Sequence, residues 1–317
     1  MSNILVTGGL GTIGRHLVNE LRLRGHKVWL LDLRHFHDDN YFRCDIASFQ
    51  QLERVFNSQH FDFVYHLAAE FGRWNGEDFY DTLWRTNVIG TKNVIRLQER
   101  FGFKMTFSSS SEVYGDFQGV MSEDVMDRIE IKQLNDYAMT KWVNEMQIIN
   151  SAAMFGTETV RVRLFNTYGP GEFYSHYRSV NCLFCYRALH GIPFSVYRGH
   201  RRTSTYVTDA VFALANIQDQ FKPGEIYNVG GGEFHDIETL AHHVLKATGA
   251  SPTLVIYKDS EPFTTKEKRI DNAKATRDLG FRITVSLEEG VQRTVDWMRK
   301  VYKVGEPTTE ILNLDVI

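Results

Sequence analysis

A glycine-rich turn directly after a short apolar segment is the feature that most constrains the fold of this chain. Residues 4–6 are Ile-Leu-Val, and Gly8, Gly11 and Gly14 follow at intervals of three. Gly8 allows a tight turn, Gly11 lets the backbone approach a pyrophosphate, and Gly14 lets a helix and a strand pack closely. The N-terminus of that helix also attracts phosphate. The pattern therefore predicts a dinucleotide-binding βαβ unit.

Short apolar segments alternate with longer segments of helical periodicity through the first half of the chain. This alternation is typical of a parallel sheet with helices on both faces. Strands are expected at residues 4–7, 27–32, 61–67, 104–108 and 159–165. Helices are expected at residues 11–24, 48–57, 87–101 and 137–155. The predicted fold class is α/β, a Rossmann-like doubly wound parallel sheet.

The alternation weakens after residue 166, where a smaller C-terminal α/β lobe is expected to begin. In this part, helices are expected at residues 180–189, 237–248, 271–279 and 287–301, and a strand at 226–229. We predict an NAD-binding domain over residues 1–166, rejoined by residues 203–230. The substrate lobe is expected to comprise residues 167–202 and 231–317, and the cleft between the two parts is the expected ligand site.

The composition favours small-molecule partners. The formal net charge is −3, and lysine and arginine are scattered, so nucleic acid is not an expected partner. No segment resembles a signal peptide or a membrane span, so we expect a cytoplasmic protein without membrane contact. Cys44, Cys182 and Cys185 are too few for a disulfide framework, and Cys182-x-x-Cys185 lacks the second pair of ligands of a structural zinc site. No metal site is expected.

Two further features indicate the cofactor and its chemistry. Asp32 ends the second expected strand, where a carboxylate accepts hydrogen bonds from ribose hydroxyls and repels a 2′-phosphate, so NAD is favoured over NADP. Arg34 nearby keeps NADP open. Tyr137 and Lys141 share one helix face, so the ammonium and a positive nicotinamide would both lower the pKa of the phenol. Tyr137 could then take a hydroxyl proton, with Ser110 bonded to the same hydroxyl.

Further short motifs follow the glycine-rich turn in order. They are His66-Leu67-Ala68-Ala69, Asn87-Val88-Ile89-Gly90-Thr91, Ser108-Ser109-Ser110, Tyr137-x-x-x-Lys141 and Phe165-Asn166-Thr167-Tyr168-Gly169-Pro170. Together they resemble the extended short-chain dehydrogenase/reductases of the nucleotide-sugar epimerase/dehydratase family, over residues 4–297. The resemblance implies an NAD-dependent enzyme that acts on a nucleotide-diphosphate sugar. It also implies a homodimer that pairs through the helices at residues 87–101 and 137–155.

The resemblance also implies which residues contact the ligands. The expected cofactor contacts are Gly8, Gly11, Thr12, Ile13, Gly14, Asp32, Asp45, Ile46, Leu67, Ala68, Ala69, Asn87, Tyr137, Lys141 and Phe165. The expected substrate contacts are Glu70, Arg73, Asn166, Arg178, Tyr197, Arg202 and Arg269. Arg202 matches the family's diphosphate-contacting arginine, while Lys268 and Arg269 match a basic position that often reaches the phosphates.

Glu112 bears most directly on the type of reaction. It occupies the place where similar 4,6-dehydratases and sugar-acid decarboxylases carry a catalytic glutamate, and where simple 4-epimerases usually carry a small neutral residue. After oxidation at C4, a carboxylate here could remove the C5 proton and drive loss of the C6 hydroxyl. The preferred interpretation is an NDP-sugar dehydratase: C4 oxidation by bound NAD, water elimination assisted by Glu112, and hydride return.

Two departures from the family pattern keep other reactions open. Ser111, included with the catalytic set, stands where many 4,6-dehydratases place an aspartate that protonates the leaving hydroxyl. Decarboxylases of UDP-glucuronate share the Ser-Glu pair but have a proline-rich segment where this chain has residues 70–76. An NDP-sugar 4-epimerase, a UDP-glucuronate-type decarboxylase and a ketosugar reductase therefore remain alternatives. A non-catalytic NAD-binding sensor is the alternative outside enzymes, and the intact Ser110, Tyr137 and Lys141 set argues against it.

Overall fold

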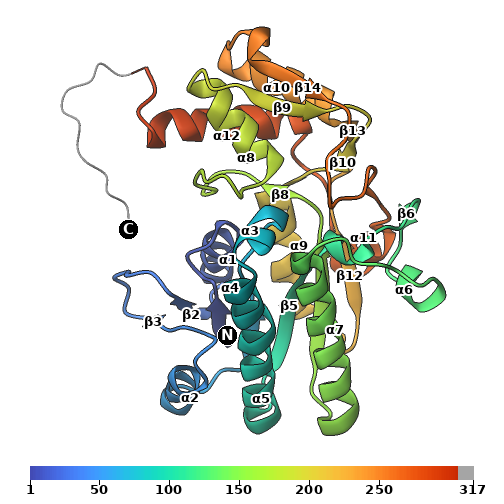
Figure 1. Cartoon of the computed structure of the whole chain (residues 1–317). Helices are drawn as coiled ribbons and strands as arrows, with labels where there is room; N and C mark the ends of the chain where they lie inside the picture. Colours follow the sequence, from blue (N-terminus) through green and yellow to red (C-terminus); the bar gives the residue numbers. More distant parts are fainter. Residues whose placement is uncertain (306–317) are drawn as a thin grey trace.

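A parallel sheet of seven strands forms the centre of the molecule (Figure 1). The computed structural model describes residues 1–305, and the strand order is β12-β7-β5-β4-β1-β2-β3. The strands are β1 (Asn3–Thr7), β2 (Lys27–Asp32), β3 (Tyr41–Arg43), β4 (Phe63–His66), β5 (Lys104–Ser110), β7 (Thr159–Leu164) and β12 (Ile226–Val229). Every neighbouring pair is parallel. The sheet confirms the predicted doubly wound α/β fold.

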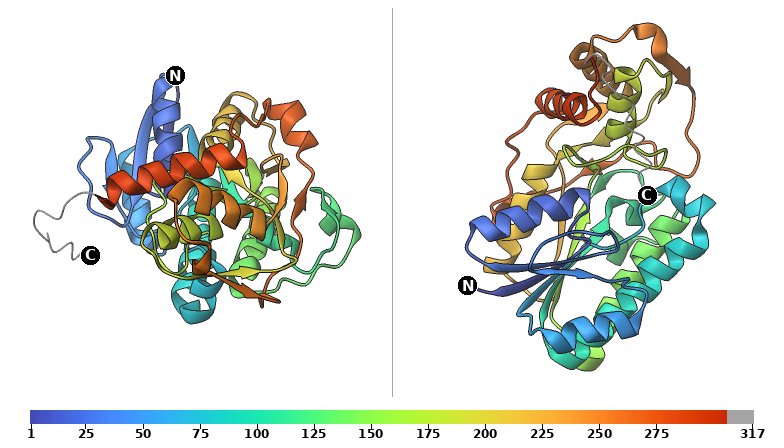
Figure 2. Two further views of the ribbon diagram at one scale, coloured as in Figure 1. Left: turned by 90° about the horizontal axis from the view of Figure 1, so that it is seen from above. Right: turned by 90° about the vertical axis from the view of Figure 1, so that its left-hand side faces the viewer.

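Helices cover both faces of this sheet, as the right-hand view of Figure 2 shows. One face packs against α1 (Thr12–Leu23), α9 (Val207–Asp219) and α11 (Ala273–Leu279), and the other against α2 (Phe49–Ser58), α5 (Thr91–Phe101) and α7 (Asp136–Phe155). The strand residues alternate between the two cores because successive side chains point to opposite faces. Ile4 and Val6 join the first core, whereas Leu5 joins the second.

A smaller lobe lies beyond the C-terminal ends of the strands, at the top of Figure 1. Its core is formed by three helices and a short parallel pair of strands. These are α8 (Val180–Leu189), α10 (Ile237–Thr248), α12 (Leu287–Val301), β9 (Phe194–Tyr197) and β14 (Val255–Lys258). An antiparallel pair, β10 (Arg201–Thr203) and β13 (Phe234–Asp236), connects this lobe to the sheet-containing part. The chain returns to the central sheet through α9 and β12, while the exact domain boundaries stay a prediction.

The remaining elements are short. They are α3 (Arg73–Asp78), α4 (Tyr80–Trp84), the π-helix η1 (Arg85–Gly90), the 3-10 helices η2 (Ser111–Tyr114) and η3 (Pro252–Leu254), α6 (Val125–Arg128), β6 (Val120–Met121), β8 (Thr167–Tyr168), β11 (Thr205–Tyr206) and β15 (Arg269–Ile270). Among them, α3, η1, η2 and β8 border the space between the two parts. The helix expected at residues 87–101 therefore begins inside a π-helical turn. Among residues 1–305, no helix is long and apolar enough to cross a lipid bilayer.

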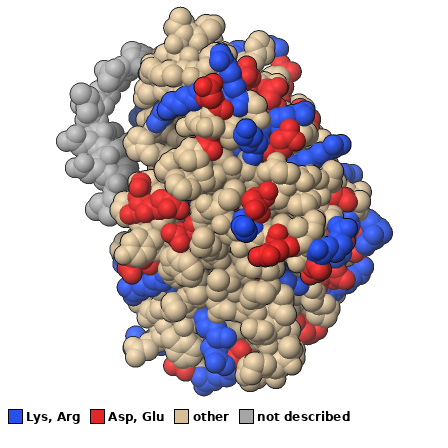
Figure 3. All heavy atoms as spheres, turned by 45° about the vertical axis from the view of Figure 1, so that its right-hand side comes forward, with Lys and Arg blue, Asp and Glu red and all other residues tan. Residues whose placement is uncertain are grey.

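The strand order places the ligand site. β1 lies between β2 and β4, so the chain crosses to one side of β1 and then to the other. In open α/β sheets, the crevice at such a switch point, beyond the carboxyl ends of the strands, is where ligands bind. The small lobe stands over this edge of the sheet. On the outer face drawn in Figure 3, acidic and basic side chains are interspersed.

Candidate active site

A long cleft runs from the glycine-rich turn, past the ends of β4 and β5, to the small lobe. Its volume is about 800 Å³, within the range of roughly 300–1,000 Å³ that is typical of ligand sites. The predicted residues that line it are Gly8, Gly11, Thr12, Ile13, Gly14, Asp32, Asp45, Ile46, Leu67, Ala68, Ala69, Glu70, Arg73, Ser110, Ser111, Glu112, Tyr137, Lys141, Asn166, Arg178, Tyr197 and Arg202. The structure thus brings most of the predicted cofactor and substrate residues to one surface.

The glycine-rich turn between β1 and α1 leaves no space for side chains. Gly8 has a φ of 69°, a backbone conformation that favours glycine. A Cβ atom on Gly14 would overlap the carbonyl oxygen of Gly8. Because α1 begins at Thr12, the backbone N–H groups of its first turn lie at the cleft without helical partners. This cradle suits the pyrophosphate of a dinucleotide.

Asp32 lies at the end of β2, beside the cradle. Its Oδ2 accepts a hydrogen bond from the backbone N–H of Leu10 at 3.1 Å, and its Oδ1 accepts one from Leu33 at 2.9 Å. Arg34 lies 3.4 Å from the same carboxylate, but its side chain is 52% exposed. The negative charge is therefore fixed where dinucleotide-binding folds hold the ribose hydroxyls, and this arrangement suits NAD.

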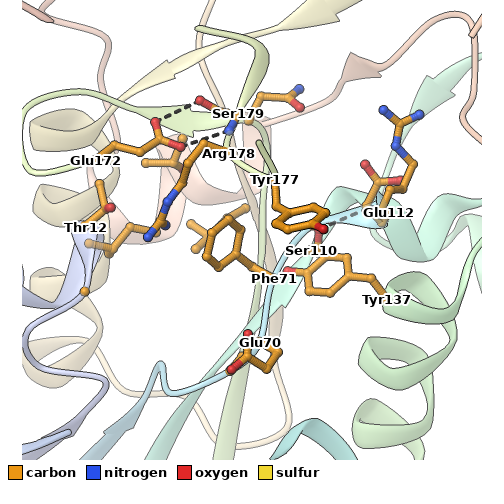
Figure 4. A pocket seen from close by; sticks show the side chains of 18 of the residues that line it. Thr12, Glu70, Phe71, Ser110, Glu112, Tyr137, Glu172, Tyr177, Arg178 and Ser179 are labelled. Carbon is orange, nitrogen blue, oxygen red and sulfur yellow. Dashed lines mark hydrogen bonds between the residues drawn. The ribbon is translucent and has the colours of Figure 1, made fainter. Parts of the chain in front are cut away.

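Ser110, Tyr137 and Lys141 meet at the C-terminal end of β5, and Figure 4 shows Ser110 beside the ring of Tyr137. The side chains of Ser110 and Tyr137 both line the cleft, and the Ser110 hydroxyl favours the phenolate form of Tyr137. Lys141 Nζ donates a hydrogen bond to the carbonyl oxygen of Ser108 at 2.8 Å and lies 5.8 Å from the centre of the Tyr137 ring. The predicted grouping of these three side chains is thus present in the structure.

Burial sets the charge states of this pair. It lowers the pKa of Lys141 to about 7, although Glu145 opposes the change. Burial raises the pKa of Tyr137 by more than the nearby Ser110 hydroxyl lowers it. The protein by itself therefore favours the neutral phenol. The lowered phenol pKa that the sequence predicts requires a further positive charge, such as that of an oxidised nicotinamide.

Glu112 follows β5 in η2 and forms an ion pair with Lys268. The Glu112 backbone N–H also donates to the Ser110 hydroxyl at 3.2 Å, so both residues share one short turn (Figure 4). Burial alone would raise the pKa of Glu112, but Lys268 and then Arg73 outweigh it and lower the pKa to about 2. Burial lowers the pKa of Lys268 to about 8 against the opposing effect of Glu112. At neutral pH the pair is a carboxylate and an ammonium.

Two arginines lie at the same end of the cleft. Arg73 Nη2 lies 2.6 Å from Glu261 Oε1, and Arg202 Nη2 lies 4.0 Å from Glu261 Oε2. Arg202 Nη1 donates to the backbone carbonyls of Arg201 and Lys266, each at 2.9 Å. Arg202 is thus anchored by its surroundings while still lining the cleft. The sequence predicted both arginines as substrate contacts but did not indicate Glu261.

Arg178 lies at the opposite end of the cleft from Glu112. Figure 4 shows it with Thr12 and Glu172, far from Tyr137. Its guanidinium stacks 4.1 Å from the centre of the Phe71 ring. Glu172, buried and absent from the prediction, accepts hydrogen bonds from the backbone N–H and the hydroxyl of Ser179 at 3.0 and 2.8 Å. Arg178 therefore lies near the glycine-rich turn, away from the expected sugar end.

Three predicted contacts do not line the cleft. Asn87 is buried behind it, where its amide accepts from the N–H of Glu70 at 2.8 Å and donates to the Glu70 carbonyl at 2.9 Å. Phe165 is fully buried in an apolar cluster. Arg269 is exposed in β15, and the neighbouring Lys268 points to Glu112 instead. Of the two basic residues before residue 271, Lys268 is therefore the one that lies beside the cleft, where it pairs with the Glu112 carboxylate.

Asn166 has a constrained position at the end of β7. Its φ is 40°, and its amide donates to the carbonyl oxygen of Thr203 at 2.9 Å. It lines the cleft together with Tyr197, an aromatic residue of β9.

Within residues 1–305, no group of three or more histidine, cysteine, aspartate or glutamate side chains is arranged to hold a metal ion.

Known proteins resemble this chain along most of its length. The NAD dependent epimerase/dehydratase family matches residues 4–230. The UDP-N-acetyl-alpha-D-glucosaminuronate decarboxylase of Bacillus cytotoxicus is 32% identical, over 94% of this chain and 98% of that protein. The dTDP-glucose 4,6-dehydratase of Salmonella typhimurium is 26% identical, over 93% of this chain and 92% of that protein. The UDP-glucose 4-epimerase of Thermus thermophilus, in complex with NAD, superposes with a TM-score of 0.85 at 27% identity and covers 94% of this chain and 99% of that one.

These similarities confirm the predicted family, the predicted enzyme class and NAD as the cofactor. They include a decarboxylase, a dehydratase and an epimerase, so they support nucleotide-sugar chemistry without selecting one reaction. The cradle of Gly8 and Gly14, the carboxylate of Asp32 and the set of Ser110, Tyr137 and Lys141 agree with that assignment. The chain belongs to the NAD-dependent epimerase/dehydratase family.

Proposed function

We propose that this protein is an NAD-dependent decarboxylase of a nucleotide-diphosphate hexuronate. In this reaction the sugar is oxidised at C4, and the C5–C6 bond then breaks with release of carbon dioxide. The observation that carries the proposal is the ion pair between Glu112 and Lys268, with Arg73 and Arg202 nearby and Ser110 in the adjoining turn. Three cations, Lys268, Arg73 and Arg202, and two carboxylates, Glu112 and Glu261, gather at the sugar end, which leaves one positive charge to match the negative charge of a hexuronate.

The oxidation step uses Tyr137, Lys141 and Ser110. Tyr137 takes the proton of the C4 hydroxyl, while Ser110 holds that hydroxyl through a hydrogen bond. Lys141 Nζ lies 5.8 Å from the centre of the Tyr137 ring, and its ammonium form stabilises the developing phenolate by its charge. The glycine-rich turn and Asp32 would hold NAD, which would supply the acceptor for the C4 hydride and return that hydride to C4 after carbon dioxide has left, so that no other oxidant is needed. The side chains thus transfer one proton, from the C4 hydroxyl to Tyr137. Because the phenol of Tyr137 is largely withdrawn from solvent, water does not compete with the C4 hydroxyl as the proton donor.

Carbon dioxide loss follows from the C4 ketone. The carboxylate at C6 is then β to a ketone, so the C5–C6 bonding electrons can move toward the ketone oxygen as carbon dioxide leaves. C5 afterwards requires a proton, and we assign its donation to the Lys268 ammonium. The low pKa of Glu112 makes it a poor base for removing a C5 proton, but keeps it charged and able to hold Lys268 in place. This electrostatic arrangement favours decarboxylation over elimination.

Relatives with the same chemistry support the proposal. The Bacillus cytotoxicus protein is a decarboxylase of a UDP-linked uronate and matches almost the whole of both chains. The UDP-glucuronic acid decarboxylases of Xenopus tropicalis and Arabidopsis thaliana are 28% and 29% identical over most of this chain. By this analogy, UDP-glucuronate and its 2-acetamido counterpart are the first substrates to test.

Mass spectrometry of reaction products tests the proposal. The purified protein is incubated with UDP-glucuronate, UDP-N-acetylglucosaminuronate, UDP-glucose and dTDP-glucose. We expect loss of carbon dioxide from a uronate and no change in the neutral sugars. Loss of water from a neutral sugar would instead show dehydration, and an isomer of unchanged mass would show epimerisation. Either result without decarboxylation contradicts the proposal.

A 4,6-dehydratase is the second candidate, and one observation favours it. Ser111 cannot easily protonate a leaving C6 hydroxyl, whereas the Lys268 ammonium beside Glu112 can. In that reaction Glu112 removes the C5 proton and Lys268 protonates the departing hydroxyl, so that water leaves. Glu112 would have to act as a base despite its low pKa, which is why we rank this reaction second.

We further propose that the protein forms a homodimer through the two predicted helices at residues 87–101 and 137–155, with an interface that extends over the adjoining α4. These elements pack side by side and carry exposed apolar side chains, namely Tyr80 (64% exposed), Ile89 (52%), Met139 (40%) and Ile149 (40%). Light scattering should give the mass of two chains. Ile89→Lys should yield a monomer, and Val301→Lys, on the exposed surface of α12, should not. A monomeric wild-type protein would contradict the dimer.

A cytoplasmic location is also proposed. Cys44, Cys182 and Cys185 are buried and free, which is the state that a reducing compartment maintains. Cell fractionation with an antibody against the native protein tests this location, and recovery outside the cytoplasmic fraction contradicts it.

A further inference from the structure

Glu261 lies between two guanidinium groups at the sugar end of the cleft. One of its carboxylate oxygens is 2.6 Å from Arg73 Nη2, and the other is 4.0 Å from Arg202 Nη2. The side chains of Arg73, Glu261 and Arg202 are 17%, 18% and 7% exposed, and all three residues line the cleft. An acidic side chain of the protein thus occupies a position between two cations that face the ligand space.

The segment that carries Glu261 reaches the cleft from the small lobe. It follows β14, and its Pro262 carbonyl accepts a hydrogen bond from Arg73 Nη1 at 3.1 Å. Phe263 packs edge-on against Trp74, with 5.8 Å between ring centres. Two segments from distant parts of the sequence therefore meet over the sugar end, and Arg73 connects them through its guanidinium.

We infer that Arg73 and Arg202 form an anion subsite and that Glu261 fills it until an anionic group of the substrate replaces it. The inference rests on the proposed function, because the substrate must bring an anion to this end of the cleft. Guanidinium groups bind carboxylate and phosphate oxygens alike through paired hydrogen bonds. A sugar carboxylate and a diphosphate oxygen could therefore both displace Glu261.

The surroundings favour the sugar carboxylate as the occupant. Arg73 and Glu112 both line the cleft, and the charge of Arg73 lowers the pKa of Glu112, so the subsite lies at the end of the cleft that holds the proposed reacting groups. Arg202 Nη1 is held by the carbonyls of Arg201 and Lys266, and Nη2 donates to the Thr264 hydroxyl at 3.2 Å, with Glu261 Oε2 at 4.0 Å as its nearest carboxylate oxygen. The shortest contact of Arg73 is with Glu261, so a substrate carboxylate in the subsite would replace one carboxylate contact with another.

Binding measurements with three ligands test the subsite. The NAD-saturated wild type and the variants Arg73→Gln and Glu261→Gln are titrated with UDP-glucuronate, UDP-glucose and UDP. We expect Arg73→Gln to weaken UDP-glucuronate binding by roughly 10- to 100-fold, the loss of one or two charge-assisted hydrogen bonds. Its effect on the other two ligands should be several times smaller. Glu261→Gln should strengthen UDP-glucuronate binding, because it removes the competing anion.

Each alternative outcome has a defined meaning. If Arg73→Gln weakens the binding of all three ligands equally, the group that displaces Glu261 is the diphosphate. The anion subsite is then correct, with the diphosphate as its occupant. If Glu261→Gln weakens binding as Arg73→Gln does, Glu261 merely holds Arg73 in place and the inference is wrong. Glu267→Gln, an exposed charge change in the same segment, is the matched control and should leave all three affinities unchanged.

A folding defect in Arg73→Gln would not hide the answer. Arg73→Lys keeps the positive charge but loses the paired hydrogen bonds, so it should retain part of the preference for UDP-glucuronate. Turnover is measured separately: Arg73-dependent binding without release of carbon dioxide keeps the subsite and contradicts the proposed reaction. If the wild type binds none of the three ligands, both the subsite and the proposed function are wrong.

Discussion

Lys268 and Glu112 form an ion pair at the cleft although 156 residues separate them in the sequence. Glu112 follows the central strand β5, and Lys268 precedes β15 beyond the small lobe. The contact therefore joins the two parts of the molecule at the expected reacting end of the sugar. It keeps Glu112 ionised and places an ammonium group where the proposed reaction needs a proton.

The pH dependence of turnover should report on Lys268. Its ammonium form predominates below its pKa of about 8 and is lost as the pH rises through that value. The rate constant kcat should therefore fall on the alkaline side. Lys268→Arg keeps the ion pair with Glu112 but supplies no proton near neutral pH, so kcat should drop by about 10²- to 10³-fold. Steady-state kinetics across this pH range make the measurement, and an unchanged kcat in Lys268→Arg would rule out proton donation.

Tyr137→Phe should remove the group that takes the C4 hydroxyl proton. We expect kcat to fall by at least about 10²-fold, while the amount of NAD bound per chain stays as in the wild type. Turnover assays and cofactor extraction measure the two quantities. Tyr257→Phe, at an exposed tyrosine that is not among the residues lining the cleft, serves as the control and should keep full activity. Full activity in Tyr137→Phe would contradict the assigned role.

Replacement of Lys141 should change the stability of the protein and its activity in opposite directions. Burial lowers its pKa in the folded protein to about 7, from an ordinary value of 10.5. Between these values the unfolded chain binds the proton and the folded chain does not, so the free energy of unfolding rises with pH. Lys141→Met should flatten this rise and raise the stability below about pH 7, and should abolish turnover. Urea unfolding at several pH values checks this, and an unchanged pH slope would count against it.

A buried ion pair behind the active site should matter far more for stability than one at the surface. Glu145 accepts from Arg163 through both oxygens, at 3.0 and 2.9 Å, and both side chains are at most 1% exposed. Glu145→Gln leaves Arg163 without its counter-charge and should lower the free energy of unfolding by about 3–5 kcal/mol. Glu53→Gln breaks an exposed pair with Arg100 and should cost at most about 1 kcal/mol.

Urea unfolding of both variants decides this comparison. Equal losses in Glu145→Gln and Glu53→Gln would mean that burial of the Arg163 pair carries no special weight. Glu145 also accepts a hydrogen bond from the Ser109 hydroxyl at 2.5 Å. Replacement of Glu145 therefore also affects the end of β5, where Ser110 lies.

The cofactor half of the site was predictable because its signals are local. Gly8, Gly14 and Asp32 belong to one βαβ unit, and Tyr137 and Lys141 belong to one helix. Their spacing along the sequence determines their spacing in the structure, whatever the rest of the chain does. The same reasoning explains why six of the seven strands of the central sheet were predicted close to their observed bounds, whereas the three-residue strand β3 was not predicted.

The sugar end was predictable only in part because it is built from long-range contacts. Arg73 and Glu261, and likewise Glu112 and Lys268, meet through loops far apart in the sequence. No motif around Glu261 indicates its partner. Helix α9 was missed for a related reason: it is buried along most of its length between α1, α11 and the sheet, so it lacks the one-sided apolar periodicity by which surface helices are recognised.

The fate of the sugar carboxyl carbon tests the central claim most directly. UDP-glucuronate and UDP-N-acetylglucosaminuronate, isotopically labelled at that carbon, are incubated with the NAD-loaded protein, and the released gas and the nucleotide product are analysed together. We predict labelled carbon dioxide in equal amount to a nucleotide sugar that has lost one carbon. A product that keeps the label, with water lost or only its stereochemistry changed, would contradict the proposed decarboxylation.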